Sequence, residues 1–541
     1  MSFLNVTHAK LSTLSPVHLG SGEDFLPTNY VIDDGWLYSF NEMGLAQALG
    51  HKLDKIKSIV HSEHGEQMLL SIQRLIHDNK EQLGKLASRN IPVAAGFVQL
   101  YKSRIGQVAQ RENNKRNVIN QLPIMKTFIN PHNQRPIVTG SAIKGAIRTA
   151  ILNDLAIKAG LKRPQDVKDS RKLPNDLLGF RNPTEDPLKL LKISDGEYEH
   201  SENLPATEIV FAVSKRRVAK DGKTAGGPTT YLEAISGFRH QSFSFDIRFL
   251  NNPSQNPNHK LPSDITSLTK ICNAYYLPKL VKELRELDEM NYLSDSFVRG
   301  LQQLLEGELK QAIAQNKMLL LKLGKHSGAY NKTLDNLRQI HIPQHKKVVS
   351  ETPEVRLAAT ASAQQAVDLL PFGWVIIEFD NTKLCNLENF IKSQAIENNA
   401  YQLKEKLYQI QQKQKQELIS IEQQRQAKIA QENAKKVEEE NKRIKEEEFA
   451  KQPLYAQALT KFKECLETDK KTFKSKNRQF QQPASIVGQA LITLFDAYTN
   501  DWPSEATAEL KTLASEAFNY LGVDRKKKDS IAKNLWQKLP Q

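Results

Sequence analysis

The chain has 541 residues, 39% of them hydrophobic, which is enough for more than one core because domains commonly comprise ~100 to 200 residues. Its 76 Lys and Arg residues outnumber 61 Asp and Glu residues, and the net charge of +15 favours a polyanionic partner such as nucleic acid. Three scattered cysteines argue against a disulfide scaffold and a cysteine-rich zinc site. The lack of long apolar runs argues against a membrane span and a signal peptide, so we expect a cytoplasmic protein.

The first forty residues predict short strands. Apolar residues alternate over residues 6–14, 30–32 and 36–40, and Asp33, Asp34 and Gly35 form the turn between the last two runs. From residue 44 to 87 the apolar spacing becomes helical.

The middle of the chain alternates between helical and extended patterns. A proline-containing stretch from residue 118 leads into the small-residue helix AIKGAIRTAIL, and the polar residues 162–187 predict an exposed loop. The spacing of residues 268–315 predicts helices. Strands or compact apolar runs are predicted at 188–194, 208–215, 242–250, 318–323 and 374–379.

The composition changes after Asn398, where roughly fifty residues without Gly or Pro predict a helix up to ~75 Å long. Its sparse apolar positions leave two alternatives, a weak coiled coil and a solvated single helix. The tail from Pro453 predicts a small helical bundle. Its basic runs, residues 470–478 and 525–528, either contact phosphates or form a solvated charged face. The predicted regions are therefore 1–397, 398–450 and 451–541.

Three glycine-containing segments lie beside cations. The first, LSPVHLGSG, contains His18, Gly20, Ser21 and Gly22 and also fits an ordinary turn. Glycine allows the backbone to approach a ligand closely, so that successive N–H groups converge on an anion. The segment is therefore a candidate anion site.

The second segment, TGSAIKGAIRTAIL, places Gly140 and Ser141 before a helix that carries Lys144 and Arg148 on one face. Cations near a helix N-terminus oppose the helix dipole, which a bound phosphate would explain. Ordinary N-capping by Ser141 is the alternative.

The third segment, LKLGKHSGAYNKT, contains Gly324, Lys325, Ser327 and Gly328. It lacks the spacing of a P-loop, so nucleotide hydrolysis is not indicated. Small donors, basic residues and the Tyr330 ring suit a single RNA strand.

Taken together, the segments resemble the RAMP superfamily of CRISPR-associated proteins and, within it, the Csm-type subunit that caps type III-A effector complexes. The resemblance covers residues 10–379, and the paired GSxIKGAxR and LGxxSGxxxKT elements are its specific part. Residues beyond 398 lie outside it and are compatible with replacing or recruiting a small helical subunit. The motifs that occur in the family's order are LSPVHLGSG, PTNYVID, LYSF, PIVTGSAIKGAIRTAIL, LKISD, YLEAISGFRHQSFSFDI, LLLKLGKHSGAYNKT and GWVIIEF.

This resemblance implies an α+β fold with a ferredoxin-like (RRM-like) core and helical insertions. The implied function is structural: the subunit holds the 3′ portion of the guide RNA (crRNA) and supports crRNA maturation and antiviral defence, without a cofactor or metal. Expected partners are crRNA, target RNA and other subunits of the complex, and the protein contacts backbone while base pairing reads sequence. The RNA-binding residues that the resemblance implies are His18, Gly20, Ser21, Gly22, Gly140, Ser141, Lys144, Gly145, Arg148, Gly324, Lys325, His326, Ser327, Gly328 and Lys332.

Catalysis is a competing interpretation. A metal-independent ribonuclease needs a general base, a general acid and a cation, for which His18, His326, Tyr330, Lys332 and Lys144 are candidates. None of them lies in a motif that requires catalysis, so we expect a binding protein and not an enzyme.

Three weaker alternatives complete the set. Asp33 and Asp34 suggest metal-dependent cleavage, but a turn explains them more simply. His61 and His64 have a spacing compatible with zinc but no evident third ligand. A pure scaffold would show no RNA affinity in the region up to Asn398.

Overall fold

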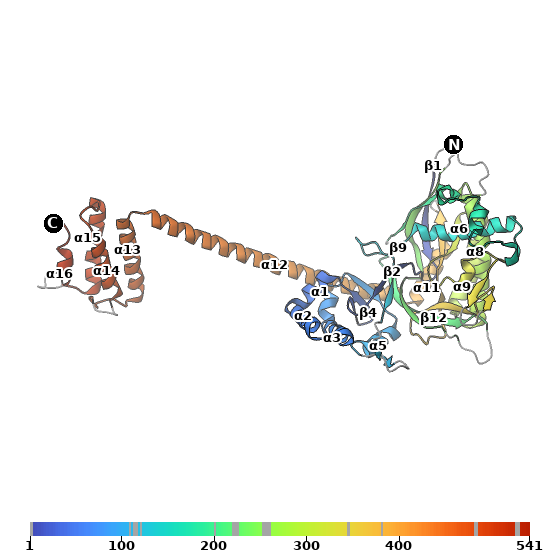
Figure 1. Ribbon diagram of the computed structural model, residues 1–541, viewed down its shortest axis with the longest axis horizontal. Helices are drawn as coiled ribbons and strands as arrows, with labels where there is room; N and C mark the ends of the chain where they lie inside the picture. The colour runs from blue at the N-terminus through green and yellow to red at the C-terminus, as the bar shows by residue number, and fades with distance from the viewer. Residues whose placement is uncertain are drawn as a thin grey trace. The chain divides into compact units, whose positions relative to one another are not determined.

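The computed structural model describes residues 4–107, 110–111, 117–118, 122–199, 202–218, 225, 227–250, 261–342, 347–379, 382–480, 485–524 and 531–540. The chain divides into two compact units, Met1–Ile419 and Ser420–Gln541 (Figure 1). The boundary falls inside the long helix α12, Ala400–Lys451. No helix in the described ranges is long and apolar enough to cross a membrane.

The first unit contains a large sheet whose neighbouring strands are antiparallel. All side chains of β15 and β20 are buried, which explains their continuous apolar sequences, whereas β1 alternates between exposed and buried positions. In spatial order the strands are β15 (Met318–Lys322), β20 (Trp374–Phe379), β1 (Leu4–Thr13), β14 (Arg239–Leu250), β11 (Gly196–Tyr198) and β9 (Ile137–Val138), with β10 (Leu191–Ile193) also paired to β14.

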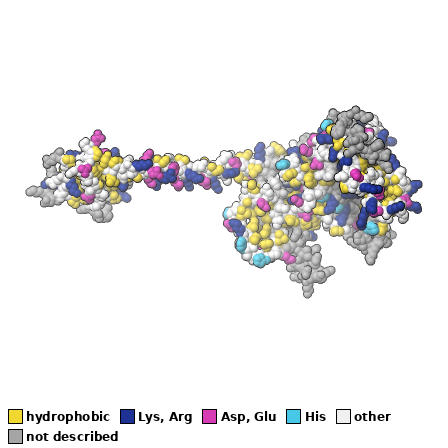
Figure 2. Space-filling view, turned by 45° about the horizontal axis from the view of Figure 1, so that its top comes forward, with side chains coloured by type: hydrophobic (Ala, Val, Ile, Leu, Met, Phe, Trp, Pro, Cys, Tyr) yellow, Lys and Arg dark blue, Asp and Glu magenta, His cyan; other side chains and the backbone are white. Residues whose placement is uncertain are grey.

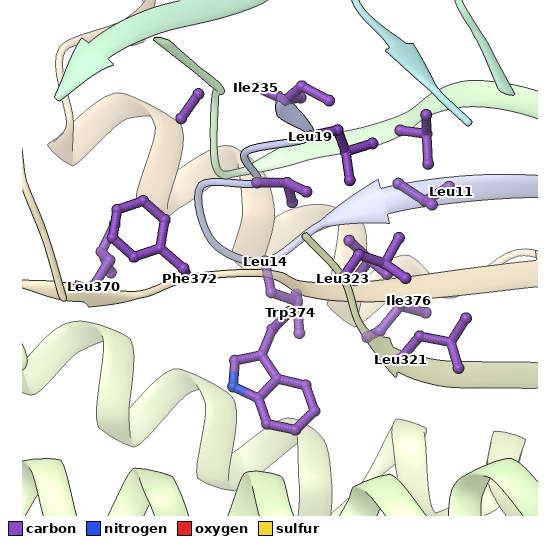
Figure 3. Close-up of a cluster of buried hydrophobic side chains, with 14 of the residues drawn as sticks. Leu11, Leu14, Leu19, Ile235, Leu321, Leu323, Leu370, Phe372, Trp374 and Ile376 are labelled. Atoms are coloured by element: carbon purple, nitrogen blue, oxygen red, sulfur yellow. The ribbon is translucent and has the colours of Figure 1, made fainter. Parts of the chain in front are cut away.

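Helices α6 (Gly140–Lys158) and α8 (Ile265–Glu289) pack against each other and against this sheet (Figure 1). The Tyr276 hydroxyl donates to the Ala146 carbonyl between the two helices at 3.0 Å. Trp374 points from β20 toward the helices (Figure 3), and its indole N–H donates to Glu283 at 2.7 Å. The result is an α+β arrangement, as predicted.

A second sheet lies beside the first, and a bridge between Val17 and Ile235 joins the chain after β1 to it. Leu14, Leu19, Ile235 and Phe372 are among the apolar side chains that gather where β1 ends (Figure 3). This core fixes the segments that follow β1 and β15. In spatial order the strands of the second sheet are β19 (Leu370–Pro371), β18 (Glu354–Ala359), β12 (Thr207–Arg216), β13 (Thr230–Ile235), β8 (Ile124–Thr127) and β2 (Gly20–Phe25).

A smaller layer is inserted between β2 and β8. Asp34 and Gly35 both have positive φ, which gives the tight turn that the sequence predicted between two strands. The layer consists of β3 (Tyr30–Asp33), β4 (Trp36–Ser39), β5 (Arg89–Pro92), α1 (Glu42–Leu49), α2 (Leu53–Ser62), α3 (Gly65–Asp78), α4 (Lys80–Lys85) and α5 (Ala95–Arg104).

Helix α12 changes character along its length. Leu403, Leu407 and Ile410 pack on the inserted layer, and the Gln414 amide donates to Asn90 at 2.8 Å. From residue 420 onward its side chains are predominantly exposed, and acidic and basic side chains alternate along it (Figure 2). Within the described chain this second part is exposed along its length, and the solvated single helix and the weak coiled coil both stay predictions.

The second unit is a helical bundle with its own core, as predicted. Large side chains such as Phe462, Phe495 and Phe518 are almost completely buried in it. The helices after α12 are α13 (Leu454–Thr472), α14 (Ile486–Ala497), α15 (Ser504–Leu521) and α16 (Ile531–Trp536).

Other details differ from the predictions. The expected loop at 162–187 contains the short helix α7, Leu173–Leu178. The strand expected from residue 188 begins at Leu191, because residues 187–190 form a 3-10 turn opened by Pro187. Gly20 starts a strand and not only a turn. The remaining helices and strands are α9 (Asp295–Glu306), α10 (Glu308–Ala314), α11 (Cys385–Glu397), β6 (Gln110–Arg111), β7 (Asn117–Val118), β16 (Ile340–Ile342) and β17 (Lys347–Val349).

Candidate nucleic-acid interface

The glycine-rich loop, residues 324–328, follows the buried strand β15. Gly324 has a φ of +78°, and a Cβ at this position would overlap the carbonyl oxygen of His18. Directly after it, the Lys325 backbone N–H donates to that same carbonyl at 2.8 Å. Only glycine permits this approach, because any side chain meets both the backbone strain and the clash.

Internal hydrogen bonds hold the glycine-rich loop in shape. The Ser327 hydroxyl donates to the Gly324 carbonyl at 2.8 Å, and Lys332 Nζ donates to the same oxygen at 2.6 Å. The Asn331 amide donates to the Ser327 carbonyl at 2.8 Å. His326 and Gly328 also adopt positive φ, so the loop is ordered by backbone geometry before any ligand binds.

His18 lies directly beside this loop. Its ring is 1% exposed, and its Nδ1 lies 2.6 Å from the Glu233 carbonyl oxygen. Burial lowers the pKa of His18, which favours the neutral ring. A Cβ on Gly20 would lie 3.2 Å from the imidazole Nε2. Two of the three predicted segments therefore meet in space.

Cations surround His326 at the centre of the loop. Burial, followed by Arg356 and Lys325, lowers the pKa of His326 to about 4. Its Nε2 is buried and has no hydrogen-bond partner in the described part of the chain, and its ring lies 5.4 Å from that of Phe372. Burial and the neighbouring cations together favour the neutral form of this imidazole.

The cations of this cluster bond mainly to neutral groups, and Glu354 acts electrostatically on Arg356. Lys325 is exposed, and its Nζ contacts the Met125 sulfur at 2.9 Å. Arg356 donates to the Ala212 carbonyl at 3.2 Å, and burial lowers the pKa of both Arg356 and Lys332. None of the three forms an ion pair within the described ranges. We call Lys325, Lys332 and Arg356 the loop cations; His326 lies among them as a neutral imidazole.

Sequence reasoning missed Arg356. It lies on β18, outside every glycine segment, and acts electrostatically on His326 from there. A single cation within the apolar strand sequence EVRLAA was the available signal.

Ser21 and Gly22 lie at the exposed start of β2. The Ser21 hydroxyl donates to the Lys126 carbonyl at 3.3 Å. Gly22 has a φ of +86° with open space around its missing side chain. Both are accessible to a ligand that reaches the edge beside His18.

The residue that caps the start of α6 is not the one that the sequence predicted. Thr139, and not Ser141, caps the helix by accepting from the Ala142 N–H at 3.3 Å, while Ser141 donates to the Thr139 hydroxyl. The Gly140 N–H donates to Asp195 at 2.7 Å, and a Cβ there would overlap the Ile193 carbonyl. Gly140 therefore serves close packing of α6 on the segment between β10 and β11.

The two cations of α6 have partners within the chain. Arg148 forms an ion pair with Asp186 at 2.6 Å, and Lys144 Nζ donates to the Leu191 carbonyl at 2.8 Å. Burial lowers the pKa of Lys144. Gly145 has open space around its missing side chain. These contacts give both cations a structural role, and their predicted contacts with phosphates stay a prediction.

The catalytic and metal alternatives have simpler structural explanations. Asp33 accepts a hydrogen bond from Lys80 beside the predicted turn, and His61 lies 2.7 Å from the Lys57 carbonyl oxygen. Tyr330 is enclosed by cations, among them Arg338 at 4.1 Å from its ring centroid. In the ranges that the structure describes, no group of three His, Cys, Asp or Glu side chains is placed to hold a metal ion.

Comparisons with known proteins identify curated relatives of this chain. Two curated Mycobacterium tuberculosis proteins named "CRISPR system Cms protein Csm5", from strains CDC 1551 and H37Rv, are each 26% identical to this chain over 159 residues. The match covers 29% of this chain, which thus spans 41% of the length of those relatives.

Two solved structures also match. A crystal structure of T. onnurineus Csm5 is 14% identical, covers 68% of this chain and 99% of its own, and has a TM-score of 0.39. A chain from a cryo-EM structure of a Csm-crRNA-target RNA ternary complex in a type III-A CRISPR-Cas system is 16% identical, covers 69% of this chain and all of its own, and has a TM-score of 0.36.

The model of the RAMP superfamily matches residues 10–308, which is more than half of the chain. The glycine-rich loop lies just beyond the matched residues, whereas the His18 edge and α6 lie within them. The chain belongs to the RAMP superfamily.

Proposed function

We propose that this chain is a Csm5-type subunit of a type III-A CRISPR effector complex. In this role it binds the backbone of the crRNA, caps the filament of backbone subunits at the crRNA 3′ end, and supports crRNA maturation and antiviral defence in the cytoplasm. Its partners would be crRNA, target RNA and the other subunits. Membership of the RAMP superfamily and the similarity to proteins named Csm5 support this assignment.

The observation that carries the proposal is the glycine-rich loop with its cations. An RNA backbone presents phosphate oxygens at regular spacing, and these accept hydrogen bonds from Lys, Arg and backbone N–H groups. Lys325 is exposed and available to such oxygens, and the loop cations form no close ion pair within the described chain. Backbone binding of this kind suits a subunit that accepts any guide sequence.

The sheet order supports a ferredoxin-like core. In chain order, β1, α6, β11, β14, α8 and β20 follow the βαββαβ pattern of this fold. Their spatial order is β20, β1, β14, β11, with β15 as an additional edge strand. Both helices pack on the same sheet, which matches the split βαβ arrangement.

The proposed role is binding and not catalysis. The endoribonuclease alternative rests on His18 and His326, which lie at one loop beside cations. His18 is almost completely buried and holds a backbone carbonyl, so it has no path to a 2′-hydroxyl. Incubating purified protein with crRNA precursor, with and without a divalent metal, tests this point, and cleavage abolished by His326→Ala would overturn it.

Binding is tested with the loop cation that has the fewest structural contacts. We expect Lys325→Glu to weaken crRNA binding at least tenfold and Lys325→Arg to restore it, because charge and not shape is required. Lys310 is an exposed lysine of α10 in the same unit, and Lys310→Glu is the matched control. Affinity is measured by fluorescence anisotropy over a salt series. Equal loss in both charge reversals would reject a specific site at the loop.

Assembly is tested by purification from the native host. Recovery of the tagged chain with crRNA and companion subunits is expected for wild type and for Lys310→Glu. Recovery free of RNA and of other proteins would refute the assignment.

A further inference from the structure

A second group of cations lies in the helical bundle. Helix α13 ends at Thr472 with the exposed Lys471 in its last turn, and the connection toward α14 carries the exposed side chains Lys474, Lys476 and Arg478. We call residues 471–478 the basic loop. None of these four cations forms an ion pair in the described part of the chain, whereas the adjacent Lys470 pairs with Glu467 and Glu516. The charge of the basic loop is therefore not compensated.

Phe473 occupies an unfavourable conformation within this loop. It is the C-cap of α13 with φ +52° and ψ +25°, the left-handed position that glycine usually takes. Its ring is 59% exposed, and Lys476 Nζ lies 5.0 Å from the ring centroid. A left-handed backbone at a residue other than glycine costs stability, and strain of this kind is often found at functional positions.

A buried polar network holds the basic loop in place. Asp469 is 5% exposed, and its carboxylate accepts from the Ser475 N–H at 2.8 Å and the Tyr520 hydroxyl at 2.7 Å. Ser475 is fully buried, and the Asn477 N–H donates to the Tyr520 carbonyl at 3.0 Å. The cations and the ring are therefore displayed on a fixed backbone, which reduces the entropy lost on binding.

The helix dipole does not account for this charge. Lys470 and Lys471 lie in the last turn of α13, where cations are favourable. Lys474, Lys476 and Arg478 lie beyond the helix end and gain little from the dipole. An acidic protein surface would pair with the cations but would leave Phe473 without a role.

We propose that the basic loop binds an unpaired nucleic-acid strand, with its four cations on phosphates and Phe473 stacked on a base. Exposed cations around an aromatic ring provide both interactions by which proteins hold single strands without reading sequence. This site lies in the second unit and outside residues 10–308, so it is separate from the glycine-rich loop. The other basic run, residues 525–528, lies outside the described residues and is not needed for the argument.

The test uses the full-length protein and a labelled ten-nucleotide oligouridine. The quadruple variant replaces Lys471, Lys474, Lys476 and Arg478 by alanine and should lose binding at the bundle. The slope of log affinity against log salt concentration should become shallower by up to about 3, at roughly 0.7 per phosphate contact. Phe473→Ala should weaken binding about tenfold, in the range typical of stacking. A DNA oligonucleotide of the same length identifies any contribution of the 2′-hydroxyl, and a duplex should bind more weakly because its bases are already stacked.

Two control variants separate specific contacts from net charge and exposed apolar area. Lys428, Lys435, Lys436 and Lys442 are exposed on α12, and their joint replacement by alanine removes the same charge from the same unit. Leu454→Ala removes an exposed apolar side chain from α13. Both controls should bind like wild type.

Stoichiometry separates this proposal from the proposed function. If both hold, wild type binds two oligonucleotides per chain and the quadruple basic-loop variant binds one. If only the basic loop binds, wild type binds one oligonucleotide per chain and the quadruple variant binds none. Ultraviolet crosslinking should attach RNA to the peptide that contains Phe473. Unchanged binding in the quadruple variant, an equal loss in the α12 control, or a duplex bound as tightly as the single strand would overturn the proposal.

Discussion

The two cationic loops of this protein present their charge in opposite ways. In the glycine-rich loop, cations and a buried imidazole line a backbone that glycine brings against the His18 carbonyl. In the basic loop, all four cations are exposed and the left-handed position is taken by Phe473. The first arrangement suits fixed phosphates held close to the backbone, and the second suits a strand whose position along the loop is free to vary. The two loops are similarly rich in cations, but their different burial suits them to different ways of binding a strand.

We expect the largest effect from a substitution that prevents the close approach of Gly324 to the His18 carbonyl. Gly324→Ala adds a clash with the His18 carbonyl to the cost of a positive φ, so we expect a loss of roughly 3 kcal/mol in the free energy of unfolding. Gly22→Ala carries the φ cost alone, because its surroundings are open, and should lose only about 1 kcal/mol. Denaturant unfolding of both variants gives the comparison. Equal losses would mean that the clash relaxes and that the loop is less constrained than described.

We expect the second largest effect when the buried Asp469 carboxylate, which holds the basic loop in place, is removed. Asp469→Ala leaves the buried Ser475 N–H without its acceptor, whereas the Tyr520 hydroxyl keeps its bond to the backbone carbonyl of residue 469 at 2.9 Å. The change should cost about 2 kcal/mol in the second unit. Single-strand binding should weaken even though no cation is removed. Circular dichroism melting and anisotropy measure the two effects. Full affinity in a destabilised Asp469→Ala protein would show that the loop needs no fixed backbone.

A pH titration sharpens the contrast at His326. Its folded-state pKa of about 4 lies below the ordinary value of 6.5, so its stabilising contribution is complete above 6.5 and is lost as pH falls toward 4. After allowance for solvent screening, we expect a loss of the order of 1 kcal/mol over this window. His326→Gln should reduce that pH dependence, whereas His132→Gln, at an exposed site, should leave it unchanged. Identical pH profiles for the two variants would contradict the assigned environment of His326.

The smallest expected effect is a gain in stability and not a loss. Phe473→Gly relieves the left-handed strain and removes an exposed ring, so the second unit should gain up to about 1 kcal/mol. The same variant should lose the stacking contribution to single-strand binding. A melting temperature that falls, together with unchanged binding, would show that Phe473 is structural.

Much of the architecture follows from local sequence. Alternation over residues 6–14 specified β1, helical spacing specified the helices of residues 268–315, and the Gly-free and Pro-free stretch after Asn398 specified α12. These patterns work because strand and helix periodicity place apolar side chains on one face within a few residues. The glycines at positions 22, 324 and 328 marked left-handed backbone for the same local reason.

Only the tertiary structure decided which groups meet. His18 and Gly324 are separated by about three hundred residues, and the pairing of β1 and β15 with β20 brings them together. The fold also brings Arg356 of β18 close enough to act on His326, and packing against the segment before β10 gives Arg148 its partner Asp186. The motifs therefore identified candidate residues, while burial and long-range pairing decided which cations are already satisfied within the chain. A periodic pattern records which face of an element is buried, but it does not record what that face is buried against.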